Sequence, residues 1–356
     1  MDENRFHVVV GTKGQLIKMA PIMLEMDRRG IKYNFINAAQ HTKILYDIIG
    51  VFGLKQPDIV LDMALWLSKV TLSSFSQDGL PKKNDICLIH GDPIPASFGA
   101  VLSKLHRAKI AHIESGERTH NIFNPFPEEL SRRMIDRMAD YLFTSSEESY
   151  NNVIKQGVKG EIINLGYNTV IDAIRFAIAN SQKVTFEPEP GYVLVNVHRV
   201  ENLYSKERLD IIISTVEKIA QNERVLMIMH EPLKNKLIKT NMLDTLKGYE
   251  NIQMIPLQDY VTNINLIKNS KYIVNDGGAP QLESYFLSRP CLLMRGFMEQ
   301  NGYPNVCLSR YDTTIIDDFL QNYNNYVFDV DINALKSPSK EIVDILAEKM
   351  ARLKNT

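Results

Sequence analysis

The chain contains little cysteine, with Cys87, Cys291 and Cys307 the only three in 356 residues. They are far apart and each lies in an apolar run, so they form no Cys pair of the kind that binds zinc. Buried, reduced thiols are the simplest interpretation, and they are typical of a reducing compartment. The cysteines give no support for a disulfide framework, and we expect a cytoplasmic protein.

An excess of charge of either sign is also missing. The 41 lysines and arginines nearly balance the 42 aspartates and glutamates, which leaves a formal net charge of −1. This balance excludes the basic surplus typical of proteins that bind nucleic acid or anionic membranes. No apolar run approaches the ~20 residues that span a bilayer, and the polar N-terminus is unlike a signal peptide. We predict neither nucleic acid nor a membrane as a partner.

Signatures of metal, nicotinamide and nucleophilic catalysis are absent as well. The eight histidines have no ligand-type spacing, and no serine or cysteine stands in a recognised nucleophile motif. The turn Gly11-Thr12-Lys13-Gly14 lacks the third glycine of a dinucleotide fingerprint, and the second strand ends in Asn37 where an acid would bind ribose. We therefore expect no metal and no cofactor. The turn fits a tight connection and an anion-binding helix start equally well.

What the chain does contain is an alternation of short apolar runs, rich in strand-forming residues, with amphipathic helical stretches. Continuous apolar strands separated by helices are typical of parallel sheets covered on both faces. In the first half the expected strands are residues 6–10, 33–37, 86–89, 109–113, 141–144 and 161–164. In the second half they are residues 192–197, 224–229, 252–255, 272–275, 291–294 and 306–308. Two such series predict an α/β protein with two Rossmann-like domains.

The domain boundary is expected where the sequence Leu-Gly-Tyr-Asn-Thr leads out of a strand into a new helix. We assign residues 1–167 to an N-terminal domain and residues 168–339 to a C-terminal domain. The last helix, about residues 340–356, is expected to pack back on the N-terminal domain. Two such lobes imply a cleft between them, faced by the C-terminal ends of the strands.

Acidic residues follow two strands of the first half. Asp92 and Glu114 each close a strand, so both carboxylates are expected in the crevice at the C-terminal edge of the sheet. Asp92 alone is equally well explained as an N-cap. Glu128 lies in the first turn of a helix, where the dipole favours acids and where Arg132 is close enough to pair. Because Asp92 and Glu128 are both expected near Glu114, an acid–base role is the better interpretation of these two residues.

Strand ends in the second half carry His198, His230 and the pair Gly277-Gly278. A histidine at a strand end can donate to a phosphate or a sugar hydroxyl. Two glycines before a helix let backbone N–H groups approach a diphosphate. Glu283, early in that helix, is placed to reach ribose hydroxyls. A tight turn explains the glycines too, but it explains the whole set less economically.

Short motifs run in the same order through nearly the whole chain. They are Gly11-Thr12, Lys18-Met19-Ala20-Pro21, Gln40-His41, His90-Gly91-Asp92, His112-x-Glu114-x-Gly116-x-Arg118-Thr119, Pro125-x-Pro127-Glu128-Glu129-x-x-Arg132, His198-Arg199-x-Glu201-Asn202, Asp276-x-Gly278-x-x-Gln281-x-Glu283, Pro290 and Met294-Arg295. Each motif is modest alone, but their ordered sum resembles the UDP-N-acetylglucosamine 2-epimerase family.

The resemblance implies two lobes of the GT-B type, a nucleotide site in the second lobe, a UDP-sugar substrate and a homodimer. It implies loss of the C2 proton with departure of UDP from C1, followed by re-addition of UDP with protonation on the other C2 face. The implied acid–base residues are Asp92, Glu114 and Glu128. The implied substrate-binding residues are Lys13, Lys18, Arg132, His198, Gly277, Gly278 and Glu283, and Gln40 and His41 match the place where an activating second UDP-sugar binds. The implied function is a non-hydrolysing epimerase that feeds capsule or surface-polysaccharide synthesis.

Alternatives remain open at the level of sequence. Lys13, Ala279 and the segment after Asp92 depart from the family pattern around the diphosphate and the sugar, which leaves the exact nucleotide sugar open. Water capture of the intermediate would give a hydrolysing epimerase. A retaining glycosyltransferase shares the glycine pair and Glu283, but it would not need Asp92, Glu114 and Glu128 together. A nucleotide-sugar binder without activity is a third class.

Overall fold

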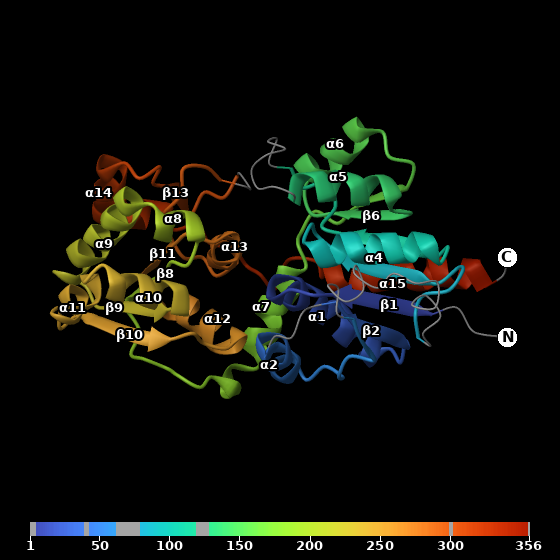
Figure 1. Ribbon diagram of the computed structural model, residues 1–356, viewed down its shortest axis with the longest axis horizontal. Coiled ribbons are helices and arrows are strands. Elements are labelled where there is room, and N and C mark those ends of the chain that lie inside the picture. Colours follow the sequence, from blue (N-terminus) through green and yellow to red (C-terminus); the bar gives the residue numbers. More distant parts are fainter. Residues whose placement is uncertain (1–4, 39–42, 62–78, 119–127, 299–301, 355–356) are drawn as a thin grey trace. The chain divides into compact units, whose positions relative to one another are not determined.

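The computed structural model describes residues 5–38, 43–61, 79–118, 128–298 and 302–354. The chain divides into two compact units, and the first is formed by residues 1–173 with residues 336–356. The second unit is formed by residues 174–335. Each unit has its own parallel sheet, and Figure 1 shows the elements of both.

The first unit alternates strands and helices along the chain. Its strands are β1 (Phe6–Val10), β2 (Tyr33–Asn37), β3 (Ile59–Val60), β4 (Ile86–His90), β5 (Lys109–Ile113), β6 (Tyr141–Thr144) and β7 (Glu161–Asn164). Its helices are α1 (Lys13–Arg28), α2 (Lys43–Phe52), α4 (Ile94–Leu105), α5 (Glu128–Met138), α6 (Glu147–Gln156), the start of α7 (Val170–Ala179), and α15 (Pro338–Lys354).

The strands of the first sheet lie in the order β3-β2-β1-β4-β5-β6-β7, and every neighbouring pair is parallel. The order reverses direction between β1 and β4. In open parallel sheets the crevice outside the strand C-termini at such a switch point is where ligands bind. The residues that follow β1, β4 and β5 are therefore the ones to inspect.

Both faces of the first sheet are covered by helices. Val9, Ile89 and Leu142 are fully buried and belong to one apolar cluster that includes residues of α4, α5 and α6. On α1, Leu16 and Met23 are fully buried, and this helix packs against α2 and α15. The last helix thus joins the first unit, although the intervening chain forms the second one.

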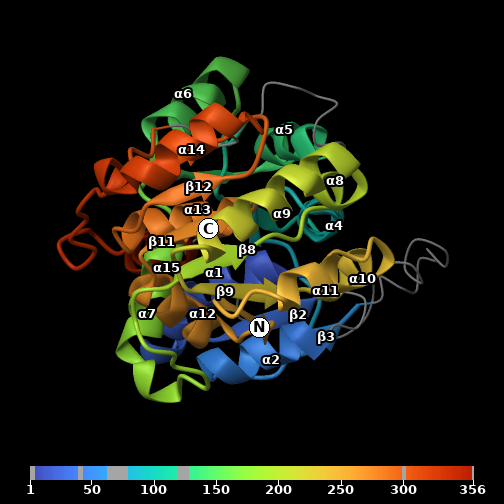
Figure 2. The ribbon, with the colours of Figure 1, turned by 90° about the vertical axis from the view of Figure 1, so that its left-hand side faces the viewer.

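The second unit has the same alternation. Its strands are β8 (Val193–Asn196), β9 (Val225–Met229), β10 (Ile252–Pro256), β11 (Tyr272–Asn275), β12 (Cys291–Leu293) and β13 (Val306–Leu308). Its helices are α8 (Val200–Tyr204), α9 (Lys206–Ala220), α10 (Glu231–Lys239), α11 (Met242–Lys247), α12 (Tyr260–Asn269), α13 (Gly278–Phe286) and α14 (Thr313–Asn322), with short 3-10 turns at Ser181–Lys183 and Tyr323–Tyr326. Figure 2 shows how they surround the sheet.

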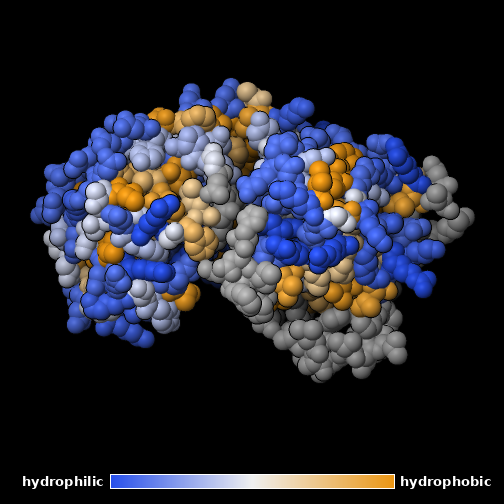
Figure 3. Space-filling model, turned by 90° about the horizontal axis from the view of Figure 1, so that it is seen from above, coloured by the Kyte–Doolittle hydropathy of each residue, from blue (hydrophilic) through white to orange (hydrophobic). Residues whose placement is uncertain are grey.

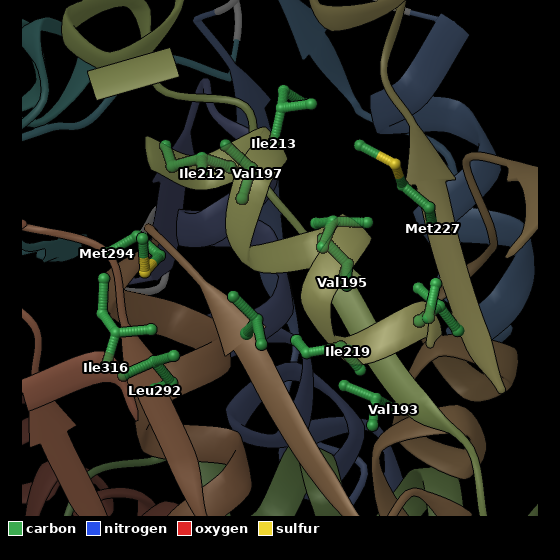
Figure 4. Close-up of a cluster of buried hydrophobic side chains, with 14 of the residues drawn as sticks. Val193, Val195, Val197, Ile212, Ile213, Ile219, Met227, Leu292, Met294 and Ile316 are labelled. Atoms are coloured by element: carbon green, nitrogen blue, oxygen red, sulfur yellow. The ribbon is translucent and has the colours of Figure 1, made fainter. Parts of the chain in front are cut away.

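The second sheet has the order β10-β9-β8-β11-β12-β13, which is the order of the first six strands of the other sheet. Val193 and Val195 point to one face of the sheet and Leu194 to the other, because successive side chains of a strand point to opposite faces. Figure 4 shows the first of these faces, where strand residues meet Ile212 and Ile219 of α9. The switch point lies between β8 and β11, so the loops after these strands are the second place to inspect.

On the face seen in Figure 3, hydrophilic side chains cover most of the described area, and apolar side chains form small separate groups. None of the described helices is both long enough and apolar enough to cross a membrane.

The predicted fold class is confirmed: both units are parallel α/β sheets of the Rossmann type. Seven predicted strands have the observed bounds, and the other five differ by one residue at one end or at both ends. The short strand β3 was not predicted, because two residues carry too little pattern. The helix α1 begins at Lys13, inside the predicted turn Gly11-Thr12-Lys13-Gly14, since Thr12 caps it.

Candidate functional site

The turn between β1 and α1 is closed on itself by a capping box. The Thr12 hydroxyl accepts from the Gln15 backbone N–H at 3.2 Å, and Gln15 Oε1 accepts from the N–H groups of Gly11 and Thr12 at 3.0 and 3.1 Å. A Cβ on Gly11 would lie 2.4 Å from Pro95 Cγ, so the glycine is required by close packing. These N–H donors are used within the protein, which favours the tight-turn interpretation over an anion site. Lys13 is exposed at the helix start.

The loop after β4 carries Asp92 and is held from two sides. Gly91 takes a φ of +63°, and its N–H donates to the Ile113 carbonyl at 2.9 Å. Asp92 is not the N-cap of α4, because Pro93 occupies that position. Instead, Asp92 Oδ2 lies 2.6 Å from Arg132 Nη2 of α5. The capping explanation of Asp92 is therefore wrong, and its carboxylate is ion-paired at the C-terminal edge of the sheet.

The loop after β5 places Glu114 in a strained backbone conformation. Its φ of +63° is uncommon for a residue with a side chain, and such strain concentrates at functional sites. The conformation is held by the Ser115 N–H, which donates to the Phe143 carbonyl at 3.0 Å. Gly116 has a φ of +81°, and a Cβ there would lie 2.1 Å from the Ser149 carbonyl oxygen. The loop therefore lies directly against the start of α6.

Glu114 stands between two cationic or proton-donating groups. Lys18 Nζ donates to its two carboxylate oxygens at 2.8 and 2.6 Å, and His90 Nε2 lies 2.9 Å from Oε2. Burial by itself would raise the pKa of Glu114, but Lys18 and His90 outweigh it and hold the pKa well below its usual value. Burial lowers the pKa of His90 more than Glu114 raises it. The pKa of the Glu114 carboxyl and the pKa of the His90 imidazole are thus both held below their usual values.

The pKa of a second acid in this loop is shifted in the opposite direction. Burial, and then the charge of Glu114, raise the pKa of Glu117 above its usual value. The Ser145 hydroxyl donates to Glu117 Oε1 at 2.7 Å. Two acids whose pKa values are driven apart are typical of acid–base sites, since one holds a proton while the other is ionised. Sequence reasoning did not select Glu117, because its spacing alone does not distinguish it from other loop acids.

The second unit is organised around a buried carboxylate at its own switch point. Asp276, which follows β11, is fully buried and accepts from the backbone N–H groups of His198 and Arg199 at 3.1 and 2.9 Å. It also accepts from Asn202 Nδ2 at 2.9 Å. The carboxylate therefore joins the loop after β8 to the loop after β11 and satisfies N–H groups at the start of α8.

The two strand-end histidines of the second unit lie together, as their positions suggested. The rings of His198 and His230 are stacked with centroids 4.8 Å apart, and His230 Nε2 lies 2.8 Å from Asn196 Oδ1. A Cβ on Gly277 would lie 3.1 Å from His198 Cε1. Gly277 thus lets the loop after β11 approach the stacked rings.

The helix α13 begins immediately behind this loop. Gly277 is its N-cap and makes no side-chain capping bond, so the first turn presents backbone N–H groups from Gly278 onward. Glu283 is 4 % exposed and lies near Tyr260, whose pKa is raised well above its usual value by burial and then by Glu283. This end of the sheet combines a helix N-terminus, imidazoles and an acid.

The structure brings some predicted residues together within each unit. In the first unit Lys18 contacts Glu114 and Arg132 contacts Asp92. In the second unit His198, Gly277, Gly278 and Glu283 belong to one sheet edge. Gln40 and His41 lie outside the described residues, and Glu128 begins α5 but its side chain is not described. Among the described residues, no group of three His, Cys, Asp or Glu side chains is placed to hold a metal ion.

The cysteines occupy the sites expected for structural thiols. Cys87, Cys291 and Cys307 are buried and free. Burial raises the pKa of Cys87 and of Cys291 to about 12. Thiols in this state are unreactive, so the candidate chemistry rests on the carboxylates.

Comparison with known proteins agrees with this arrangement. The sequence model of the UDP-N-acetylglucosamine 2-epimerase family matches residues 24–302. A UDP-N-acetylglucosamine 2-epimerase of Campylobacter jejuni is 31 % identical over 324 residues, which are 82 % of each chain. A homolog of that enzyme from Methanococcus maripaludis is 30 % identical over 303 residues, with 82 % of this chain and 84 % of the relative covered.

The fold is shared with solved structures of such enzymes. A UDP-GlcNAc 2-epimerase from Neisseria meningitidis, solved bound to UDP-GlcNAc, superposes with a TM-score of 0.83 at 24 % identity, and the match covers 97 % of this chain and 100 % of the other. The family match spans well over half of the chain, and its sequence relatives agree with it. The chain belongs to the UDP-N-acetylglucosamine 2-epimerase family, a family of isomerases.

Proposed function

We propose that this chain interconverts UDP-GlcNAc and UDP-ManNAc without net hydrolysis. The observation that carries the proposal is the ionised, buried Glu114 between Lys18 and His90, at the same sheet edge as the ion-paired Asp92. Inverting a carbon next to the anomeric centre requires proton removal and proton delivery at C2, and clustered carboxylates with shifted pKa values supply both.

The chemistry proceeds by elimination and re-addition. A base takes the C2 proton, the C2–H electron pair forms a C1=C2 double bond, and the C1–O bond to UDP breaks with its electrons leaving on the diphosphate. The products of this step are 2-acetamidoglucal and UDP. A diphosphate oxygen then re-forms the bond to C1 while a proton is delivered to the opposite face of C2. No atom is gained or lost overall, so the reaction is an isomerisation.

The first unit supplies the proton transfers in this proposal. Asp92, Glu114 and Glu128 are the acid–base residues, and Lys18 supplies positive charge to the reacting sugar or diphosphate. Supporting this role, Lys18 keeps Glu114 ionised and therefore able to accept a proton. Lys13 and Arg132 are the further cations that we assign to substrate binding, and Gln40 with His41 is assigned to a second, activating UDP-sugar.

The second unit supplies nucleotide binding. His198, Gly277 and Gly278 are assigned to the diphosphate, and Glu283 to the ribose hydroxyls. The support is the N-terminus of α13, where backbone N–H groups and the helix dipole favour a negative ligand. The cap position is a glycine, so no side chain competes for these donors there.

The non-hydrolysing form and the hydrolysing form differ only in what captures the intermediate. In the hydrolysing alternative water attacks the glucal intermediate, and UDP and free N-acetylmannosamine are released. Incubation with UDP-GlcNAc in deuterated water, followed by proton NMR, separates the outcomes. Our proposal expects two nucleotide sugars at equilibrium with deuterium at C2. Stoichiometric UDP release would replace it with the hydrolysing form, and unchanged UDP-GlcNAc would reject both.

Carboxamide variants test the acid–base assignment. Glu114→Gln and Asp92→Asn keep the side-chain size and should each lower kcat by at least about a hundredfold, because general acid–base catalysis contributes 10²–10⁴-fold. The matched control is Glu161→Gln, which removes a surface carboxylate that pairs with Lys349 at the other end of the first sheet. It should leave kcat unchanged.

The biological setting is part of the same proposal. A cytoplasmic homodimer that supplies an N-acetylmannosamine donor to capsule or surface-polysaccharide synthesis fits the family resemblance. Light scattering at micromolar concentration tests the dimer, and a mass of one chain would contradict it. Loss of surface polysaccharide on gene deletion, restored by the wild-type chain and not by Glu114→Gln, tests the pathway.

A further inference from the structure

Two residues of α5, one turn apart, connect this helix to the loop after β4, one directly and one through His112 of β5. Arg132 Nη2 lies 2.6 Å from Asp92 Oδ2. Four residues later, Asp136 Oδ1 lies 2.7 Å from Nδ1 of His112, and the other ring nitrogen of His112 lies 2.9 Å from the Gly91 carbonyl oxygen. Positions four apart share one helix face. The same face of α5 is therefore connected to two consecutive residues, to Asp92 directly and to Gly91 through His112.

These contacts are shielded from water. The side chains of His112 and Asp136 are 1 % and 0 % exposed, and Arg118 at 4 % exposure donates to Asp136 Oδ2 at 2.6 Å. Arg118 also donates to the Glu117 carbonyl at 2.7 Å. Burial would raise the pKa of Asp136, but His112 and Arg118 hold it below its usual value, so the carboxylate is ionised. Asp136 is thus the common acceptor beneath both loops.

His112 lies between two groups that accept hydrogen bonds. One ring nitrogen faces the Gly91 carbonyl and the other faces the Asp136 carboxylate. The ring therefore connects Asp136 to the Gly91 peptide, and both of its nitrogens are held by contacts within the protein.

We propose that Asp136, acting through His112, and Arg132, acting directly, are positioning residues that fix the direction of the Asp92 carboxylate for the proposed proton transfer. The inference rests on the proposed function, because Asp92 needs a fixed direction only if it meets the reacting sugar. Arg132 holds the carboxylate itself, and Asp136 with His112 holds the peptide in front of it. A misplacement of about 1 Å in such a group costs on the order of a hundredfold in rate.

The test uses Asp136→Asn, Arg132→Gln and their double variant. Asp136→Asn keeps the size of the side chain but removes the charge that His112 and Arg118 contact. We expect kcat to fall roughly tenfold to a hundredfold in each single variant. KM should change less than about threefold in Asp136→Asn and should rise in Arg132→Gln, because Arg132 is also assigned to substrate binding. In the double variant the losses should not multiply, because both substitutions release the same two residues.

A control keeps simple loss of stability apart from loss of positioning. Asp140→Asn removes another carboxylate of the first unit, which accepts from the Ile110 N–H at 3.0 Å and from Lys109 Nζ at 2.9 Å at the start of β5. It should lower the unfolding temperature and leave kcat unchanged. If Asp136→Asn does not fold, Arg132→Gln is used for the test. The ion pair of Arg132 with Asp92 is 16–17 % exposed and contributes less to the packing of the core.

An NMR readout keeps this inference separate from the proposed function. With ¹⁵N-histidine, the ring signals of His112 should be the same in the wild type and in Asp140→Asn, and they should move in Asp136→Asn. The amide signals of Gly91 and Asp92 should move in Asp136→Asn and Arg132→Gln only. Unmoved amide signals, or kcat at the wild-type level in an active enzyme, would overturn the inference. A wild type that turns over no UDP-sugar while these signals move would reject the proposed function alone.

Discussion

Lys18 donates to both carboxylate oxygens of Glu114, at 2.8 and 2.6 Å, although the two residues are 96 positions apart in the chain. The pair joins the helix after β1 to the loop after β5 across the switch point of the first sheet. Both side chains are mostly buried, at 18 % and 13 % exposure. A buried carboxylate that loses its cation destabilises the folded protein. Removing the charge of Lys18 therefore affects the stability of the site as well as its electrostatics.

Lys18→Met should raise the pKa of Glu114, because Lys18 is the largest influence that lowers it against burial. We expect kcat to fall about a hundredfold, the scale of one lost electrostatic partner, and the acid limb of the pH–rate profile to move to higher pH. Steady-state kinetics from pH 4 to 9 measures both. Lys104→Met, which removes a half-exposed lysine paired with Asp140, is the control. An unmoved acid limb would contradict the assignment of Glu114.

Glu117→Gln should make stability depend less on pH. The pKa of Glu117 is raised in the folded protein, so the folded state holds a proton that the unfolded state has already lost. The free energy of unfolding therefore falls as pH rises through the interval between the ordinary and the raised pKa. Urea unfolding at several pH values should show this fall in the wild type and a smaller one in Glu117→Gln. Parallel curves would disprove the shift.

Glu114→Gln should have the opposite signature in the same urea series. The pKa of Glu114 is lowered, so the stabilisation from its ionised form is fully present above the ordinary carboxyl pKa and is lost as pH falls toward the lowered value. The variant lacks this stabilisation at neutral pH and should lose less stability on acidification. Compared with the wild type, Glu117→Gln should therefore lose less stability as pH rises, and Glu114→Gln should lose less stability as pH falls.

Gly116→Ala should destabilise the first unit by about 3 kcal/mol or more, the range of severe backbone and packing defects. The φ of +81° disfavours a side chain, and the new Cβ would lie 2.1 Å from the Ser149 carbonyl oxygen. Gly14→Ala is the matched control, because a Cβ at Gly14 in α1 meets no atom within 4 Å. Alanine there should be neutral or stabilising by up to ~1 kcal/mol. Equal unfolding free energies for the two variants would contradict the packing argument.

Asp276→Asn should weaken UDP binding about tenfold and lower stability by about 1–3 kcal/mol, because an amide group would face buried N–H donors. The three donors come from His198, Arg199 and Asn202. Calorimetric titration with UDP and thermal unfolding measure the two effects. Asp312→Asn is the control, since Asp312 caps α14 and asparagine caps equally well. Unchanged UDP affinity would separate Asp276 from the nucleotide site.

The strands were predicted well because their signal is local. Runs such as residues 6–10 and 33–37 are rich in strand-forming residues, and they are fully or nearly fully buried in the structure. The helix α1 begins within the predicted turn at residues 11–14 because its cap is formed by the Thr12 and Gln15 side chains, which hydrophobic periodicity does not indicate. The two-residue strand β3 is defined by pairing with β2 and has no independent pattern.

The candidate site was predicted as a set of strand ends, and its contacts were not. The sequence alone allows Asp92 to cap a helix and Arg132 to pair with Glu128, and the structure instead pairs Asp92 with Arg132. His90 and Glu117 belong to the same network, yet their spacing gives no hint of it. Ion pairs of this kind depend on which strands are neighbours in the sheet, because the strand order decides which side chains come into contact.

The sequence by itself determined the parallel α/β class, the family and the strand ends where acids and glycines gather, because hydrophobic period and motif order are written along the chain. Only the tertiary structure decided that Lys18 meets Glu114 and that Asp136 reaches Gly91 through His112. These partners are brought together by the order β1-β4-β5 and by the placement of α5. Opposite charges attract when they are close and shielded from water, and closeness is a property of the folded chain.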